Sequence, residues 1–210
     1  MTTKNLMKRV MPLALAFLMI LSAVLVPVNA KAETKPSALA SYMMEVGEEW
    51  YAPVYYLDDD ASVTYKIAKK KVATVDKEGL VTANKKGKCK LVVTVKQGGK
   101  TYKTKTTITV KKELTTYEYA CRFYGEFAMT YQLCFDAAYA NGWVYDDGTY
   151  ADETYGEWLK TYYRVVMGIQ DIMDNSDNYT DEEIVTVLKY GVELLEGAGE
   201  ALDVFSSTPN

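Results

Sequence analysis

The chain has 210 residues, 49% of them hydrophobic, and a formal net charge of −4. It contains no histidine, which excludes Ser-His-Asp and Cys-His catalysis and histidine-ligated zinc. Its three cysteines are an odd number at wide spacing, so neither a disulfide framework nor a zinc knuckle is indicated. We therefore expect a protein that is not an enzyme and that uses no metal and no cofactor.

Residues 1–32 have the parts of an export signal. Lys4, Lys8 and Arg9 precede a nearly continuous apolar run at 10–26, and small residues follow in an A-x-A-like cleavage pattern. An uncleaved membrane anchor is the alternative, because the run of about 17 residues is at the lower limit for crossing a bilayer. We predict a cleaved signal peptide that meets the membrane only during export. The mature protein is then secreted or on the cell surface, where the cell wall is one place of attachment.

The rest of the chain changes its charge and its hydrophobic period at the same point. Residues 33–112 hold 16 lysines against 9 acidic residues, whereas residues 113–210 hold 19 acidic residues against 4 basic ones. The hydrophobic period changes from two residues to about 3.6. The sequence thus predicts an α+β protein of two domains, an all-β domain at 33–112 and an all-α domain at 113–210.

Alternating apolar residues mark the strands of the first domain. Apolar residues occupy every second position between Lys88 and Lys96, and residues 62–67 and 102–110 alternate in the same way. Gly98-Gly99 joins two of these runs as a hairpin turn, because glycine tolerates positive φ. About seven short strands in about 70 residues indicate an immunoglobulin-like sandwich.

A motif within this domain makes the assignment more specific. It comprises Val72-Ala73-Thr74-Val75-Asp76, Gly79, Val81, Ala83, Gly87 and Ile108-Thr109-Val110. In this order, over about residues 41–110, the sequence resembles the bacterial immunoglobulin-like domain, group 2. The resemblance implies a non-enzymatic module of surface or secreted bacterial proteins that acts as a spacer or a binding surface. Tyr65 and Cys89 depart from it, at positions where the family usually has tryptophan and a small residue.

Lysines occupy outward positions of three predicted strands. They are Lys66, Lys88, Lys90, Lys96, Lys103 and Lys105. One interpretation is a solvated surface on which charge prevents edge-to-edge pairing of sheets. The other is a basic face that attracts an anionic polymer of the cell envelope, or the acidic half of the chain. Nucleic acid is not expected as a partner, because the chain is exported and this domain has no arginine.

The acidic half is predicted to contain three amphipathic helices. The first has about 25 residues and ends at Asn141-Gly142, with a broad stripe through Tyr117, Tyr124 and Tyr131 that has Ala120, Phe127 and Cys134 along one side. The tyrosines that lie off the stripes or in loops, and are candidates for a carbohydrate- or peptide-binding surface, are Tyr119, Tyr139, Tyr145, Tyr150, Tyr163 and Tyr179. The second helix lies within 155–173. The third opens with a capping box of Thr180 and Glu183 and continues to about residue 205. Short polar loops between them predict an antiparallel three-helix bundle.

The loop between the first two helices contains the candidate ligand-binding residues Trp143, Tyr145 and Tyr150. Exposed aromatic rings stack on sugars and anchor protein interfaces. The four acidic residues at 146–153 do not have the spacing of an EF-hand calcium loop. No carboxylate pair in the helices is marked by its spacing as catalytic.

Together these features favour non-catalytic binding or adhesion to a glycan, polymer or protein of the cell envelope or the extracellular space. The alternative is a structural spacer or assembly subunit of the envelope without a ligand of its own. In that case the basic and acidic halves would pair within or between chains.

Overall fold

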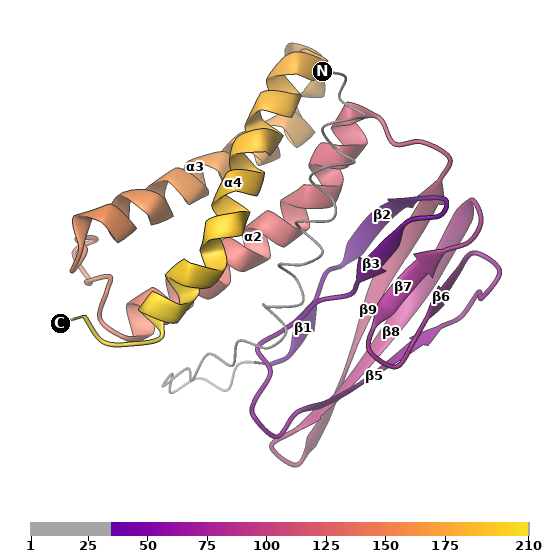
Figure 1. Ribbon diagram of the computed structural model, residues 1–210, viewed down its shortest axis with the longest axis horizontal. Coiled ribbons are helices and arrows are strands. Elements are labelled where there is room, and N and C mark those ends of the chain that lie inside the picture. The colour runs from indigo at the N-terminus through magenta and orange to yellow at the C-terminus, as the bar shows by residue number, and fades with distance from the viewer. Residues whose placement is uncertain (1–34, 210) are drawn as a thin grey trace. The chain divides into compact units, whose positions relative to one another are not determined.

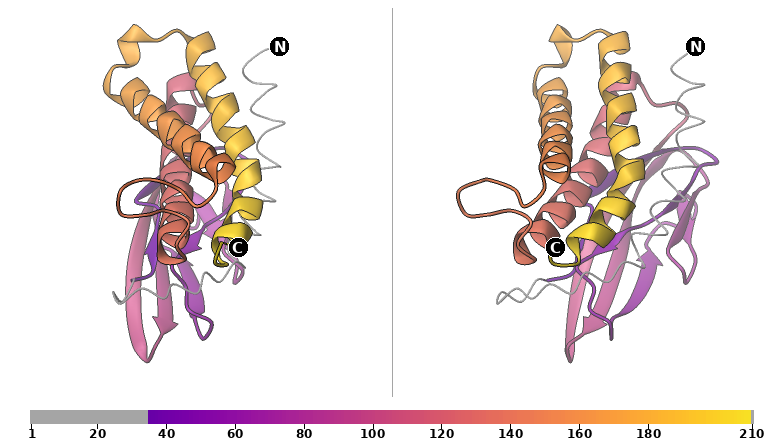
Figure 2. Two further views of the ribbon diagram at one scale, coloured as in Figure 1. Left: turned by 90° about the vertical axis from the view of Figure 1, so that its left-hand side faces the viewer. Right: turned by 60° about the vertical axis from the view of Figure 1, so that its left-hand side comes forward.

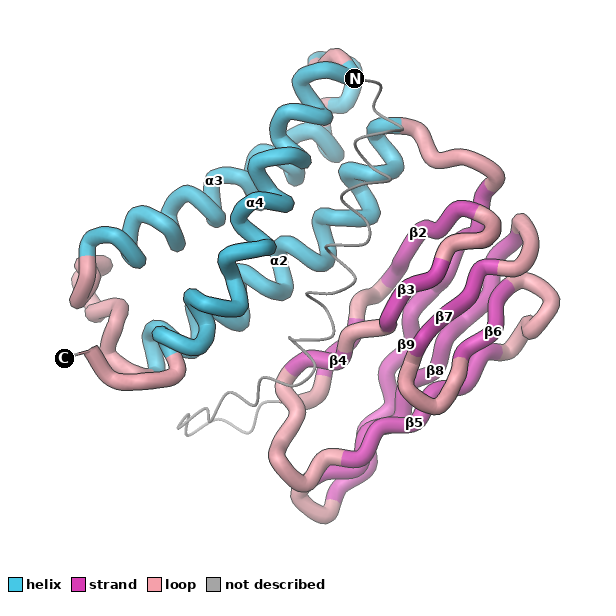
Figure 3. The backbone as a smooth tube through the Cα atoms, viewed as in Figure 1, coloured by secondary structure: helices cyan, strands magenta, loops and turns pink. Residues whose placement is uncertain are grey.

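The computed structural model describes residues 35–209, which form two compact units. One unit ends at Gly125 and is built mainly of strands, and the other begins at Glu126 and is built of helices (Figure 3). The predicted fold class, a β-sandwich followed by three helices that pack together, is confirmed. The predicted signal peptide lies outside the described residues.

The β unit contains two principal sheets (Figure 1). A four-stranded sheet has the order β2-β9-β8-β5, a three-stranded sheet has the order β3-β7-β6, and β1 pairs with β4. The strands are β1 (Ser37–Ala38), β2 (Ser41–Glu45), β3 (Glu49–Tyr51), β4 (Val54–Tyr55), β5 (Ser62–Ile67), β6 (Ala73–Val75), β7 (Leu80–Ala83), β8 (Gly87–Gln97) and β9 (Lys100–Lys111). Strands β2 and β9 are parallel, and the other pairs are antiparallel.

The predicted alternation places the core of the sandwich correctly. Leu91, Val93 and Val95 on β8 are fully buried, and Lys90 and Lys96 at the two ends of this run are exposed. Across the core, the rings of Tyr42 on β2 and Trp50 on β3 stack with centroids 3.8 Å apart. This aromatic pair joins the two sheets, because each ring comes from a different sheet.

Two glycine turns determine the register of the sandwich. Gly98 and Gly99 both have positive φ and connect the paired residues Gln97 and Lys100, as expected of a two-residue hairpin. Gly79 also has positive φ, and a Cβ there would lie only 2.7 Å from Cζ of Tyr65. Glycine is therefore required at position 79 both for the backbone conformation and for the space that the Tyr65 ring occupies.

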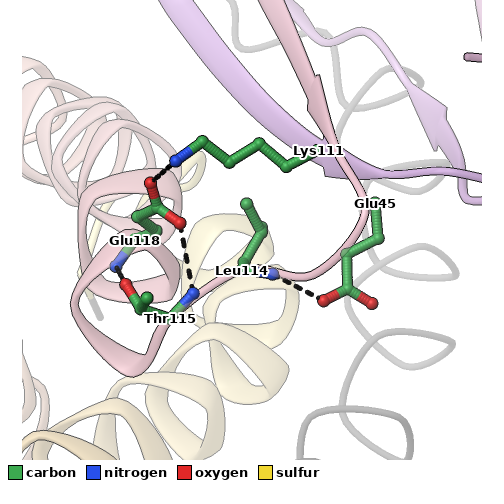
Figure 4. A network of polar contacts seen from close by, with 5 residues as sticks. All are labelled: Glu45, Lys111, Leu114, Thr115 and Glu118. Atoms are coloured by element: carbon green, nitrogen blue, oxygen red, sulfur yellow. Dashed lines mark hydrogen bonds and ion pairs between the residues drawn. The ribbon is translucent and has the colours of Figure 1, made fainter. Parts of the chain in front are cut away.

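Helix α2 (Thr116–Ala140) begins in the β unit, because the boundary between the units falls within it. Thr115 and Glu118 form a reciprocal capping box, with both hydrogen bonds at 3.2 Å (Figure 4). Glu118 also pairs with Lys111, the last residue of β9, and the Leu114 amide donates to Glu45 at 2.8 Å. Although burial opposes it, hydrogen bonds from Lys111 and Thr115 lower the pKa of Glu118.

Arg122 attaches the same part of α2 to the sandwich core. Its side chain is only 2% exposed. Its Nε donates to the Tyr42 hydroxyl at 2.8 Å, and its Nη1 donates to Glu48 at 3.0 Å. The guanidinium carbon also lies 4.7 Å from the centroid of the Tyr42 ring, within cation–π range. Arg122 is thus a buried charge with an ion-pair partner, a hydrogen-bond acceptor and an aromatic face.

The helical unit contains the rest of α2, α3 (Glu153–Asp174), a short 3-10 turn η1 (Ser176–Asn178) and α4 (Asp181–Phe205). Consecutive helices run in opposite directions (Figures 1 and 2). The predicted capping box of Thr180 and Glu183 opens α4. Gly142 has a φ of 81° just after α2 ends, as predicted for a cap. Within the described residues, no helix has the length and apolarity needed to span a membrane.

The buried stripe of α2 follows one side of the broad stripe that the sequence predicts. It passes through Ala120, Phe127 and Cys134, whereas Tyr131 is only half-buried. Half-burial lets a tyrosine hydroxyl reach the rim while the ring packs. Tyr119, predicted to lie off the stripe, is buried instead, and this burial raises the pKa of its hydroxyl.

A glycine in α4 provides a test of packing in the helical unit. A Cβ at Gly191 would lie 2.4 Å from Cε2 of the buried Phe127 ring. We expect Gly191→Ala to lower the free energy of unfolding by about 1–3 kcal/mol through overpacking, measured by urea denaturation. Gly197→Ala in the same helix is the matched control, because its nearest atom would be at 3.6 Å. There the gain in helix propensity should raise stability by up to about 1 kcal/mol, and equal effects of the two changes would contradict this packing.

The buried ion pair gives a second test. We expect Arg122→Ala to lower the stability of the β unit by about 3–5 kcal/mol in urea denaturation, because it leaves the Glu48 carboxylate without its cation. The exposed pair between Lys160 and Glu157 serves as the comparison, and Lys160→Ala should cost much less, because water screens this pair. Adding Glu48→Gln to Arg122→Ala should recover part of the loss. A cost for Arg122→Ala no larger than that for Lys160→Ala would show that Arg122 does not hold the helix.

Candidate functional site

Six exposed lysines lie on the outer face of the four-stranded sheet. They are Lys66 on β5, Lys88, Lys90 and Lys96 on β8, and Lys103 and Lys105 on β9. Their neighbours in sequence on these strands point inward, so all six side chains project from one face. We call this surface the lysine face. The structure therefore brings together all the lysines that the sequence placed on outward positions.

The register of the sheet separates these charges. Lys103 lies opposite Thr94, Lys90 opposite Thr107, and Lys105 opposite Val92. No lysine of the face has another lysine as its direct cross-strand neighbour. Like charges directly opposite would destabilise the sheet, so this arrangement keeps a dense basic surface compatible with the fold.

No carboxylate neutralises the lysine face. Strands β5, β8 and β9 contain neither aspartate nor glutamate. Within the part of the chain that the structure describes, the ion pairs involve other residues and leave all six ammonium groups of the face unpaired. The lysine face thus carries only positive charge, and a positively charged surface attracts polyanions from solution.

A pocket of about 330 Å³ adjoins the lysine face where β8 continues beyond the end of β5. Its lining residues are Ala68, Lys69, Lys88, Cys89, Lys90 and Thr107. Burial raises the pKa of the Cys89 thiol, although Lys69 partly opposes this effect. The thiol is therefore a neutral, apolar part of the wall. Two lysines of the face also belong to this pocket, so an anionic substituent of a polymer can be held here.

The predicted aromatic ligand residues have different surroundings. Trp143 donates its ring N–H to the Ser207 carbonyl at 2.5 Å, and its ring meets those of Tyr155 and Phe205 edge-on. Tyr150 packs against Gly156, where a Cβ would lie 2.6 Å from its ring. These two side chains thus have packing roles in the helical unit.

Tyr145, by contrast, is 48% exposed. The connection between α2 and α3 projects as an extended loop (Figure 2), held by a bridge between Val144 and Tyr150. Of the three predicted residues, Tyr145 has the most exposed ring, Trp143 and Tyr150 are half-buried, and a role of the three in ligand binding stays a prediction.

The acidic residues of this loop bond to the loop itself and to adjoining helices. Asp147 accepts hydrogen bonds from the backbone and side chain of Thr149, and Asp152 caps α3 by accepting from the Tyr155 amide. Asp146 accepts from the Tyr139 hydroxyl at 2.7 Å. In residues 35–209 no group of three potential metal-ligating side chains converges.

The structure also gathers four aromatic rings of α2 and α3 into one surface, and two of them, Tyr139 and Tyr163, are tyrosines that the sequence places off the helix stripes. The rings of Tyr139, Phe135 and Tyr131 follow one another on α2 at centroid separations of 6.4 and 6.0 Å, and Tyr163 on α3 continues the series at 5.6 Å. We call these four residues the aromatic row. The spacing of four residues from 131 to 135 to 139 was the available signal, because it places side chains on one helix face.

The β unit has the two packed sheets of an immunoglobulin-like sandwich. The family model described as bacterial Ig-like domain (group 2) matches residues 54–106, which confirms the resemblance recognised in the sequence. The match includes all six residues of the lysine face. No curated protein sequence matches the chain.

Two solved structures illustrate how limited the likeness to known folds is. Human protocadherin-24 EC1-2 is 15% identical, with 38% of this chain and 44% of that chain covered and a TM-score of 0.28. A SusE-like surface-located polysaccharide-binding protein from the heparin utilisation locus of Bacteroides thetaiotaomicron is 12% identical, with 38% and 16% covered and a TM-score of 0.26. The matched segments span less than half of either protein, and at these TM-scores they carry no functional argument.

The different surroundings of Trp143 and Tyr145 give a test within one loop. We expect Trp143→Ala to lower the stability of the helical unit by about 3 kcal/mol, because it removes a ring packed on two others. Tyr145→Ala should change stability by no more than about 0.5 kcal/mol, because its ring is exposed. Thermal and urea unfolding of both variants would measure the difference. Similar stabilities would contradict the packing role of Trp143.

Proposed function

We propose that the protein binds an anionic polymer, of the cell envelope or the extracellular space, through the lysine face, without catalysis. The observation that carries this proposal is the gathering of six exposed, unpaired lysines on strands that contain no carboxylate. The immunoglobulin-like fold and the family match support a surface or extracellular, adhesion-like role.

The geometry of the face suits a polymer with regularly spaced charges. Lysines two positions apart on a strand, such as Lys103 and Lys105, lie about 7 Å apart at the usual rise of a β-strand. Threonines that point outward on the same face, such as Thr94 opposite Lys103 and Thr107 opposite Lys90, offer hydroxyl groups that both donate and accept hydrogen bonds. Many weak contacts to one chain add up through effective concentration, so the individual ion pairs need not be strong.

The pocket beside β8 adds a place for a single anionic group. Three lysines surround it, namely Lys69, Lys88 and Lys90. The wall of the pocket is mainly apolar, and burying a charge there costs free energy, so an anionic substituent is attracted to the ammonium groups at the mouth of the pocket, where it stays hydrated. The pocket therefore favours polymers whose anionic substituents lie at its mouth.

Two other interpretations of the lysines lead to different behaviour. Lys103 and Lys105 lie in the part of β9 that β2 does not pair with, where charge also hinders edge-to-edge association. If the lysines only prevent edge-to-edge association, no polymer should bind. An assembly subunit, in which the basic unit of one copy pairs with the acidic unit of another, predicts salt-sensitive oligomers without any added ligand. Light scattering at low and high salt separates this case from polymer binding.

The proposal is tested with charge-reversed variants in affinity gel electrophoresis. Polygalacturonate represents an extracellular polyanion, poly(glycerol phosphate) teichoic acid represents an envelope polyanion, and dextran is the neutral control. We expect the triple variant Lys90→Glu, Lys103→Glu and Lys105→Glu to lose at least about tenfold in affinity for a polyanion, the equivalent of about 1.4 kcal/mol.

The matched control reverses the same number of charges elsewhere in the β unit. Lys77, Lys85 and Lys86 are exposed in turns outside the lysine face. Their triple reversal to glutamate should leave affinity within about a factor of two to three. Equal losses in both variants would reduce the effect to net charge and overturn the site. Wild-type binding that does not weaken at about 0.5 M salt would contradict the electrostatic mechanism.

A further inference from the structure

The aromatic row on the helical unit is a second surface with the properties of a binding site. Its two ends are exposed, with Tyr139 at 52% and Tyr163 at 49%. Phe135 and Tyr131 between them are half-buried, so their rings are partly open to solvent. Isolated exposed aromatic residues are common, but four in contact form a continuous apolar strip with polar hydroxyls along it.

The row is held in place before any ligand arrives. The Tyr139 hydroxyl donates to Asp146 at 2.7 Å, and the Tyr139 and Phe135 rings are nearly parallel, with an angle of 11°. The edge of the fully buried Tyr162 ring supports Tyr131 at 6.0 Å. Rings that are already ordered lose little conformational entropy on binding, which favours affinity for a weakly interacting ligand.

The charge of the surroundings limits what this row can bind. The chain from Glu126 to Pro209 carries 17 acidic residues against 3 basic ones. A polyanion such as the proposed ligand of the lysine face is therefore repelled from the helical unit. The ligand of the row must offer apolar faces for the rings, together with hydroxyl groups, and must carry no negative charge.

An uncharged chain of hexopyranose sugars has this chemistry. The axial C–H groups of a pyranose ring present a flat, weakly positive face to the negative face of an aromatic ring. Gln132 and Asp136 follow Tyr131 and Phe135 by one position each on α2, and they are hydrogen-bonded to each other at 2.7 Å. The carbonyl oxygen of the exposed Gln132 side chain can accept a hydrogen bond from a sugar hydroxyl at the side of the row.

We propose that Tyr139, Phe135, Tyr131 and Tyr163 form a binding site for an uncharged hexopyranose polymer. The centroid separations of 5.6 to 6.4 Å are comparable with the length of one sugar residue in an extended chain, so successive sugars can meet successive rings. The site uses different residues and different forces from the lysine face, so it adds a second ligand class to the proposed function.

Affinity gel electrophoresis in native gels that contain hydroxyethylcellulose, galactomannan or xyloglucan tests this site. The wild-type protein should be retarded by at least one of these neutral polymers, with little dependence on salt. The double variant Tyr139→Ala and Tyr163→Ala should lose at least about tenfold in affinity, because stacking contributes at both ends of the row. Both side chains are about half exposed, and thermal unfolding checks that the variant stays folded. Tyr163→Ala alone, if the double variant does not fold, should still weaken retardation.

Tyr190→Ala is the matched control, because Tyr190 on α4 is 60% exposed and is not part of the row. It should bind like the wild type, and an equal loss there would overturn the site. Absence of retardation of the wild type by all three neutral polymers would also overturn it. So would wild-type self-association that the double variant abolishes, because a second copy of the chain would then be the occupant.

The failure of one site can be told from the failure of the other. The double tyrosine variant should still bind polygalacturonate, and the triple lysine variant should still bind the neutral polymer. If both variants lost both ligands, the assignment of each ligand to its own surface would be wrong.

Discussion

The buried guanidinium of Arg122 is the interaction on which the β unit depends most. It lies beside the Tyr42 ring, which stacks on Trp50 between the two sheets, and it pairs with Glu48. A lysine would not replace it, since a flat guanidinium can stack on a ring and donate several hydrogen bonds in fixed directions at once. The start of α2 belongs to the β unit because this contact and the Lys111–Glu118 pair hold it there.

The contacts of Arg122 explain why some charged residues oppose the net charge of their own half of the chain. Glu45 and Glu48 are acidic residues in a basic domain, and Arg122 is a basic residue in an acidic one. Each accepts or donates within the network that joins the β2–β3 region to α2. A sum of charges over a long segment conceals such pairs, because partners that are 74 positions apart in sequence meet only in the folded chain.

Structural elements that follow from local, periodic sequence patterns were predictable, whereas contacts between residues far apart in the sequence were not. Alternation identified the buried and exposed sides of β8, and the capping box of Thr180 and Glu183 identified the start of α4. The capping box of Thr115 and Glu118 has the same spacing, so the start of α2 could be predicted from the sequence in the same way. Trp143 is expected at a ligand site because it lies with other aromatic residues in a loop, whereas the structure shows that its ring also packs on other rings. Its partners Phe205 and Ser207 lie more than 60 positions away, and nothing local in the sequence indicates them.

The lysine face and the aromatic row follow different physical rules because of the charge around them. Six like charges on one sheet face repel each other and lower the stability of the free protein, and a bound polyanion relieves this repulsion. Folding alone does not require such a face, since polar uncharged residues would solvate it equally well. Stacking on the aromatic row, by contrast, is short-ranged and insensitive to salt. If both proposals hold, the segregation of basic and acidic residues into separate units keeps a polyanion on the β unit and leaves the rings of the helical unit available to uncharged ligands.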